Sequence, residues 1–231
     1  MILILASAEN EAAAALARRW RESNARILAF ADLSVAGWRY ELPSTESLAV
    51  AAGKPVRSSE IAGVITMGSS VTLHDLPHIA VEDRAYAATE MQAFLVAWLH
   101  SLPCPVLNRP TPGCLCGPNW REGQWIRCAA QLGVPVVPLR RTSGVEPSFP
   151  PSAASVVVAG THVVGDVDLR LAEHARGIAR AAGVELLEVH FTGADADAAF
   201  AGVNLLPDLS HSAVADAVLD HLRSGRGGPE C

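Results

Sequence analysis

The stretch FAGVNLLPD, residues 200–208, decides the fold that this sequence predicts. Its first residues are apolar, as in a buried strand, and the strand ends at Asn204 before a turn through Pro207 and Asp208. The ends of strands are where many enzymes hold a metal or a substrate. Gly202, two residues before the asparagine, brings no side chain to such a site. The stretch therefore raises the question of whether its site is complete.

The surrounding sequence predicts the neighbours of this strand. VELLEVHFTG, residues 184–193, is a second apolar run, joined to the first by the short polar link ADAD. Upstream, SVVVAGTHVVGDVDL (155–169) predicts a hairpin that turns at Gly160 and the two residues after it. A helix over 168–182, with Gly183 as its stop, and a last helix over 212–223 complete this part.

The N-terminal third predicts alternating strands and helices. Apolar runs at 2–6, 26–30 and 61–70 predict strands, and the intervals of apolar residues predict helices over 10–22 and 84–101. The polar segment 36–60 predicts a hairpin or an irregular connection. This order implies a three-layer α/β domain whose sheet is largely parallel.

The middle of the chain is rich in turns. CPVLN (104–108) predicts a short strand, and a helix is predicted over 120–132. VPVVPLRR (134–141) should be extended because its prolines forbid a helix, and residues 142–153 should form a loop. The sequence therefore predicts a domain of residues 1–103, a second domain of residues 104–231, and a flexible tail over 224–231.

Composition excludes several classes of function. The 231 residues are 50% hydrophobic and 18% charged, with a formal net charge of −6, which is typical of a globular protein and unlike a nucleic-acid-binding or anionic-membrane-binding surface. No apolar run reaches the ~18 residues of a membrane span. MILILA at the start has no basic residue ahead of it, so we expect a first strand rather than a signal peptide, and a cytoplasmic protein.

The order of these segments and their amino-acid sequences resemble those of a known family. VVVAGTHVVGD, LAEHARGIARAAGVELLEVHFT and FAGVNLLPDLSHSAVADAVLDHL resemble the C-terminal part of ATP-grasp ligases, in the ribosomal-protein-S6-modification and glutathione-synthetase-like branch. CPVLNRPTPGCLCGPNWREGQWIRCAAQLGVPVVPLRR is similar to the stretch that leads into that branch's ATP-binding lobe. Residues 1–103 are similar to its pre-ATP-grasp domain. The resemblance implies an α/β protein with a Rossmann-like pre-ATP-grasp domain and a reduced ATP-grasp α+β domain.

The resemblance also implies requirements that this sequence does not meet. Family ligases join a carboxylate to an amine with ATP, using lysines on the phosphates and Mg²⁺ held by carboxylates and an asparagine. Lys54 is the only lysine, and the loop 142–153 stands where the central lobe would be. At the implied metal positions His190 and Gly202 replace the carboxylates, and Asn204 alone is kept. Arg140 or Arg141 could contact a phosphate, but the lobe that would position the arginine side chain is missing from the sequence.

We therefore expect a non-catalytic ATP-grasp-like protein that has lost its ATP and magnesium site, with no catalytic residue, metal or cofactor. It would bind a small molecule or peptide in the cleft between its two domains, or support a partner enzyme or a second copy in a biosynthetic or modification pathway. The alternative is an ATP-dependent carboxylate–amine ligase whose nucleotide site is completed by a second chain. A third option is a metal- or thiol-dependent activity that uses His190 and the cysteines.

The predicted ligand site combines two groups. Arginine matches carboxylate or phosphate in a bidentate manner, and an indole offers a stacking surface. The candidate ligand-binding residues are Asn108, Arg109, Asn119, Trp120, Arg121, His190 and Asn204. The first five are more typical of a hydrogen-bonded network at a domain junction, with Trp120 as packing, than of a ligand site.

The cysteines number five and lack paired CxxC spacing, so we interpret them as free thiols rather than a disulfide framework. Cys114 and Cys116, one residue apart, are interpreted as small buried thiols, with thiophilic metal binding or thiol redox chemistry as the alternatives.

Overall fold

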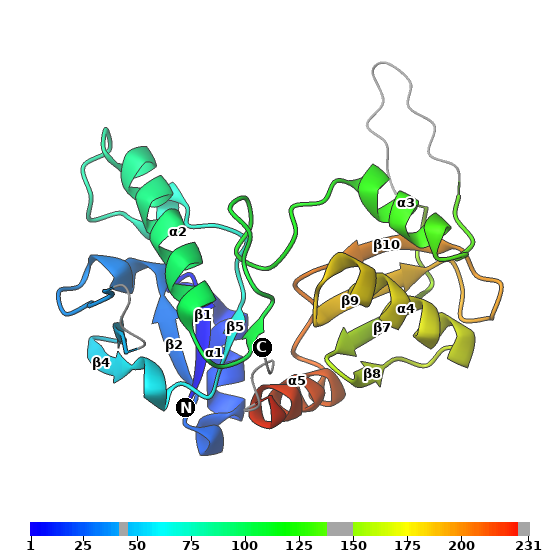
Figure 1. Ribbon diagram of the computed structural model, residues 1–231, viewed down its shortest axis with the longest axis horizontal. Helices are drawn as coiled ribbons and strands as arrows, with labels where there is room; N and C mark the ends of the chain where they lie inside the picture. Colours follow the sequence, from blue (N-terminus) through cyan, green and yellow to red (C-terminus); the bar gives the residue numbers. More distant parts are fainter. Residues whose placement is uncertain (42–45, 138–149, 226–231) are drawn as a thin grey trace. The chain divides into compact units, whose positions relative to one another are not determined.

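The structure is a computed structural model that describes residues 1–41, 46–137 and 150–225. It divides into two compact units. Unit 1 comprises Met1–Gly117 and Leu209–Cys231, and unit 2 comprises Pro118–Asp208. Each unit is described by itself below (Figure 1).

Unit 1 is built on a parallel sheet with the strand order β2-β1-β5-β6. The apolar runs predicted near the N-terminus form its strands, and the prediction of a largely parallel sheet is confirmed. The strands are β1 (Ile2–Ala6), β2 (Arg26–Ala29), β5 (Gly63–Thr66) and β6 (Val106–Leu107). Between β2 and β5, β3 (Leu48–Ala51) and β4 (Lys54–Arg57) form an antiparallel hairpin, one of the two forms predicted for 36–60.

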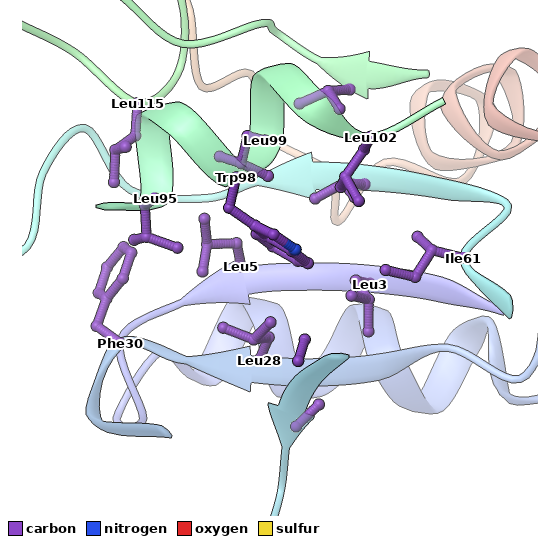
Figure 2. Packing of buried hydrophobic residues seen from close by; sticks show 14 of the residues in the cluster. Leu3, Leu5, Leu28, Phe30, Ile61, Leu95, Trp98, Leu99, Leu102 and Leu115 are labelled. Carbon is purple, nitrogen blue, oxygen red and sulfur yellow. The ribbon is translucent and has the colours of Figure 1, made fainter. Parts of the chain in front are cut away.

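The helix α2 (Arg84–Ser101) covers one face of this sheet. Its bounds match the prediction, and its buried side chains include Leu95, Trp98 and Leu99. Figure 2 shows these three pointing from the helix toward Leu3 and Leu5 of β1. Trp98 is 1% exposed, and its indole N–H donates to the hydroxyl of Ser47, so this buried ring has its polar atom satisfied.

Two further helices belong to unit 1. α1 (Glu11–Arg19) begins at Asn10, whose side chain accepts a hydrogen bond from the Ala13 N–H, as is typical of a helix N-cap. α5 (Ser212–Ser224) packs against β5 although it lies at the other end of the chain. Leu222 of α5 lies so close to Gly63 of β5 that a Cβ there would be 2.9 Å from Leu222 Cδ2.

Unit 2 is built on an antiparallel sheet with the strand order β10-β9-β7-β8. The predicted hairpin is confirmed as β7 (Ala154–Ala159) and β8 (His162–Val164). β9 (Leu186–Phe191) and β10 (Phe200–Asn204) are the two strands predicted from the apolar runs. The extended conformation predicted after the middle helix is found over 134–137, where the Pro135 carbonyl accepts from the Phe200 N–H.

Two helices cover one face of this sheet. α3 (Glu122–Gln131) and α4 (Leu169–Ala182) share a buried core with alternate residues of the strands. Trp125 and Ala129 of α3 and Ile178 of α4 pack in this core with Val189 of β9. Gly183 ends α4 in the left-handed conformation at a φ of 65°, as its place after the helix predicts.

The two units do not coincide with the predicted division at residue 104. β6 lies beyond that point but pairs in parallel with β5, with Val106 opposite Val64, and thereby extends the sheet of unit 1. α5 also returns to unit 1. Hydrogen bonding to an existing sheet edge and burial of an apolar helix face, which are both long-range contacts, therefore set the boundary.

Parts of the prediction lie outside the described residues. These are residues 42–45 of the predicted polar segment, residues 138–141 of the predicted extended stretch with Arg140 and Arg141, residues 142–149 of the predicted loop, and residues 226–231 of the predicted tail. Within the described ranges, no helix combines the length and apolar character needed to cross a membrane.

The packing of α5 on β5 can be tested by substitution. Gly63→Ala should destabilise the chain by about 1–3 kcal/mol, because the added methyl group would meet Leu222 in a filled core. The measurement is the midpoint of denaturant unfolding. Gly123→Ala is the control, because no atom lies within 4 Å of a Cβ there and alanine favours the α3 helix. Equal midpoints for wild type and Gly63→Ala would contradict the packing.

Candidate functional site

The antiparallel pair β9–β10 brings three polar side chains together on one face of the unit 2 sheet. Val189 and its alternate neighbours on β9 enter the core with α4, so Glu188 and His190 lie on the opposite face. The register places Asn204 opposite Glu188 and Gly202 opposite His190. Asn204 Nδ2 is 3.3 Å from Glu188 Oε2, and His190 Nε2 is 3.8 Å from the same oxygen.

Asn204 uses its side chain to fix the end of β10. Its Nδ2 group donates to the Leu206 carbonyl at 2.9 Å, and its Oδ1 accepts from the Leu206 N–H at 2.9 Å. The side-chain amide thus pairs with the backbone of the turn that leads to Pro207. The oxygen that would bind a cation already accepts a hydrogen bond.

Gly202 is held in a conformation that disfavours other residues. Its φ is 138°, and the pairing of β10 with β9 is irregular between Phe200 and Gly202. An L-amino acid at this φ is strained, so the backbone itself opposes a side chain here. The sequence showed that a carboxylate is lacking at this position, whereas the strained backbone is visible only in the structure.

Glu188 is the residue of this cluster that sequence reasoning missed. It stands two positions before His190, so the period of a strand places both on one face. That signal was available, although only the register reveals that Glu188 lies beside Asn204. In the described parts of the chain, no group of three or more His, Cys, Asp or Glu residues is arranged to hold a metal ion.

A groove runs along α3 as far as Ala181 of α4 and has a volume of about 580 Å³. Its lining is Trp120, Arg121, Gly123, Gln124, Arg127, Cys128, Gln131 and Ala181. The ring centroids of Trp120 and Trp125 are 4.8 Å apart, so the Trp120 indole that lines the groove is held by packing. Within the described residues, neither Arg121 nor Arg127 has a carboxylate within ion-pair distance.

The predicted ligand residues are distributed over several places. Trp120 and Arg121 line the α3 groove, whereas Asn119 is exposed and is not part of its lining. Asn108 is 2% exposed in unit 1, where its Nδ2 donates to the Cys116 carbonyl.

Arg109 also acts within unit 1. Its guanidinium donates to the carbonyl of Leu99 at 3.3 Å and to that of Cys104 at 3.4 Å. The first contact satisfies a carbonyl in the last turn of α2, as basic side chains often do at helix C-termini, and the second satisfies a carbonyl of the segment that leads to β6. The structure therefore gives Arg109 a structural role within this unit.

The four described cysteines are free and buried, as predicted. Cys114 Sγ and Cys116 Sγ are only 3.3 Å apart. The hydrogen bond from Cys116 lowers the pKa of the Cys114 thiol to about 6, even though burial opposes this. The pKa of Cys116 is raised by the same pairing and by burial, and burial raises the pKa of Cys104 to about 11.

Comparison with known proteins identifies the fold. No protein-family model matches the chain, and no curated protein matches it in sequence. Three solved structures illustrate the structural match. The macrocyclase MdnC of Microcystis aeruginosa MRC, solved with its precursor peptide MdnA, has a TM-score of 0.69 at 10% identity, covering 96% of this chain and 99% of that chain. The ATP-grasp ligase PsnB, solved with a minimal precursor, Mg and ADP, has a TM-score of 0.70 at 10% identity, covering 96% and 98%.

A third solved structure is a RimK domain ATP-grasp protein from Sphaerobacter thermophilus DSM 20745. It has a TM-score of 0.51 at 13% identity, and the match covers 96% of this chain and 99% of that chain. The resemblance predicted from the sequence is confirmed for the fold. The chain is structurally similar to ATP-grasp ligases over nearly its whole length.

The lowered pKa of Cys114 predicts an unusual pH profile. Only the thiolate reacts with iodoacetamide, so the rate of Cys114 alkylation should rise through about pH 6 and level off near neutral pH. In Cys116→Ala, which removes the hydrogen-bond donor, the midpoint should move upward toward the ordinary value of about 8.5. Mass spectrometry of the alkylated peptides measures both rates. A midpoint that is the same in wild type and Cys116→Ala would contradict the assignment of the donor.

Proposed function

We propose that this chain is a peptide-binding protein with the ATP-grasp ligase fold, and that it does not bind magnesium and ATP by itself. In this proposal unit 1 corresponds to the pre-ATP-grasp domain and unit 2 to a reduced ATP-grasp domain. The observation that carries the proposal is the pair of residues at the implied metal positions. Gly202 lies opposite His190, and its backbone conformation disfavours any residue with a side chain.

The remaining groups do not fit a magnesium ion with a triphosphate. Magnesium prefers octahedral oxygen ligands, including one or two carboxylates. On this face one carboxylate, Glu188, stands with an imidazole and with an amide whose oxygen accepts from the Leu206 N–H. The Glu188 carboxylate also adds negative charge where phosphates would lie. Lys54, the only lysine, belongs to β4 of unit 1.

The α3 groove supports peptide binding. From Glu122 to Gln131 α3 rises ~14 Å, which is the length of roughly four residues of extended peptide, and Trp120 and Arg121 continue the lining ahead of the helix. Arg121 and Arg127 offer guanidinium groups, and the side-chain amides of Gln124 and Gln131 offer further donors and acceptors. MdnC and PsnB were both solved with precursor peptides. We therefore assign the groove to a peptide that carries carboxylate side chains.

The spacing of the arginines favours a particular peptide pattern. Arg121 is the N-cap residue of α3 and Arg127 lies six positions later, which is a separation of ~9 Å along the helix axis. Side chains on one face of an extended peptide repeat every ~7 Å, a difference that long arginine side chains can span. Acidic residues at every second position would therefore reach both guanidinium groups, and bidentate pairing would hold them.

One observation favours the alternative of a ligase completed by a second chain. Glu188 and Asn204 together supply a carboxylate and an amide that could contact a cation if a partner supplied lysines. Under this alternative, nucleotide binding would require assembly and would be lost in Glu188→Gln. The ligand predicted for the cleft between the two domains stays a prediction.

Nucleotide titration tests the first part of the proposal. A ligand that binds only the native state raises the melting temperature. Because we propose that the chain alone does not bind Mg·ATP, adding Mg·ATP should give no saturable heat in calorimetry and no rise in melting temperature. A saturable response that Glu188→Gln abolishes would refute the proposal and support the ligase alternative. The titration is repeated at several protein concentrations, because assembly of copies would strengthen the response.

Peptide binding tests the second part. A short fluorescein-labelled peptide with glutamate at every second position should bind, with an anisotropy change that added salt reduces. Its glutamine counterpart should bind at least about tenfold more weakly, because hydrogen bonds to charged groups contribute about 1.5–3 kcal/mol each.

Paired variants locate the site of this peptide. Arg121→Gln combined with Arg127→Gln should weaken binding at least about tenfold, because both charge-assisted contacts are lost. Arg170→Gln is the matched control, because Arg170 lies on α4, is exposed, and is not part of the groove. Equal affinity of wild type and the double variant would remove the groove from the proposal, provided that their melting temperatures agree.

A further inference from the structure

Cys114 and Cys116 lie in a tight turn that holds their sulfur atoms together. The backbone of Thr111 exchanges two hydrogen bonds with that of Cys114, at 2.8 and 3.1 Å. The Leu115 N–H donates to the Ser69 carbonyl at 2.8 Å, which ties the turn to the chain that follows β5. Asn108 Nδ2 donates to the Cys116 carbonyl at 3.0 Å. The backbone on either side of both thiols is therefore fixed.

The two thiols differ in their environments. Cys114 is 7% exposed and Cys116 is 3% exposed, so solvent reaches Cys114 more readily. The pKa of Cys114 is lowered to about 6 by the hydrogen bond from Cys116, so Cys114 is the thiolate at neutral pH and Cys116 keeps its proton. A thiolate is the nucleophilic form of cysteine. When the thiolate is oxidised to a sulfenic acid, a neighbouring thiol can react with the sulfenic acid to form a disulfide.

We propose that Cys114 and Cys116 are a site of reversible oxidation, at which a hydroperoxide converts the two thiols into an intrachain disulfide. The sulfur atoms, 3.3 Å apart, need to approach by little more than an ångström to reach the bonded distance of about 2.05 Å. This site lies in unit 1, whereas the groove proposed for the peptide lies in unit 2.

The reaction balances with the peroxide as the only oxidant. The Cys114 thiolate attacks one oxygen of hydrogen peroxide, an S–O bond forms, the O–O bond breaks, and the departing hydroxide takes up a proton to become water. The Cys116 sulfur then attacks the sulfenic sulfur of Cys114. An S–S bond forms, the S–O bond breaks, and the hydroxide leaves with the Cys116 proton as a second water. The two thiols lose two electrons in total, and the peroxide gains them.

A soft metal ion is the competing occupant of such a pair, and the surroundings favour oxidation instead. Two thiolates alone leave most metal ions short of ligands. Among the described residues, no third His, Cys, Asp or Glu joins this pair in a metal-binding group. A disulfide across a single intervening residue closes a small, strained ring, and strained disulfides are readily reduced. The modification is therefore reversible by dithiols.

The experiment uses the full reduced chain treated with hydrogen peroxide. The number of thiols titrated after denaturation should fall from five per chain to three, because Cys114 and Cys116 are no longer free. Intact mass should fall by two hydrogen atoms, and peptide mapping should place the bond between these residues. Dithiothreitol should restore all five thiols. This wild-type measurement does not depend on any variant folding.

Three variants assign the steps. Cys116→Ser should stop at a sulfenic acid on Cys114 that dimedone traps, and Cys114→Ser should give neither the disulfide nor the trapped product. Cys104→Ser is the control, because its buried thiol has a raised pKa, and it should form the disulfide as wild type does. Retention of five thiols in treated wild type, a bond between other cysteines, or no dimedone adduct in folded Cys116→Ser would each overturn the proposal.

Discussion

The antiparallel register of β9 and β10 is the constraint on which the functional argument depends. Burial of Val189 and its alternate neighbours under α4 fixes which residues of β9 leave the core. A shift of one residue would bury Glu188 and His190 in that apolar layer, at a high cost in desolvation. The register is therefore set by the hydrophobic core, and it leaves His190 opposite Gly202 and Glu188 opposite Asn204.

The same core separates the two candidate sites of unit 2. α3 and α4 cover one face of the sheet, whereas Glu188, His190 and Asn204 lie on the other face. The groove is lined mainly by polar residues of α3 such as Arg127, with Cys128 at the edge of the core and Ala181 of α4, while Trp125 packs inside the core. Changes at the implied metal positions can therefore accumulate without altering the groove, because no side chain is shared between them. A protein with this fold can lose one property and keep the other.

Much of the fold was predictable from local patterns. The helical intervals of apolar residues gave α2 with its exact bounds, and Gly183 and the turn at Gly160 were found where their conformational preferences place them. The domain boundary was not predictable in this way. Val106 joins the sheet through a partner about 40 residues earlier in the chain, and Leu222 packs against a strand formed by residues near 63. A periodic pattern shows that such residues are buried, but it does not show against which distant element they pack.

The candidate site was predictable in its identities but not in its interactions. The sequence shows that Gly202 lacks a carboxylate, but its φ of 138° follows from an irregular strand pair. Asn204 was expected as a retained ligand, and the structure binds its oxygen to the turn before Pro207. An asparagine at a strand end is favoured by such a turn whether or not a metal is present, because the amide replaces a backbone partner. Its presence in the sequence is therefore weak support for a ligand site, and the atoms that its side chain contacts are what distinguish the two roles.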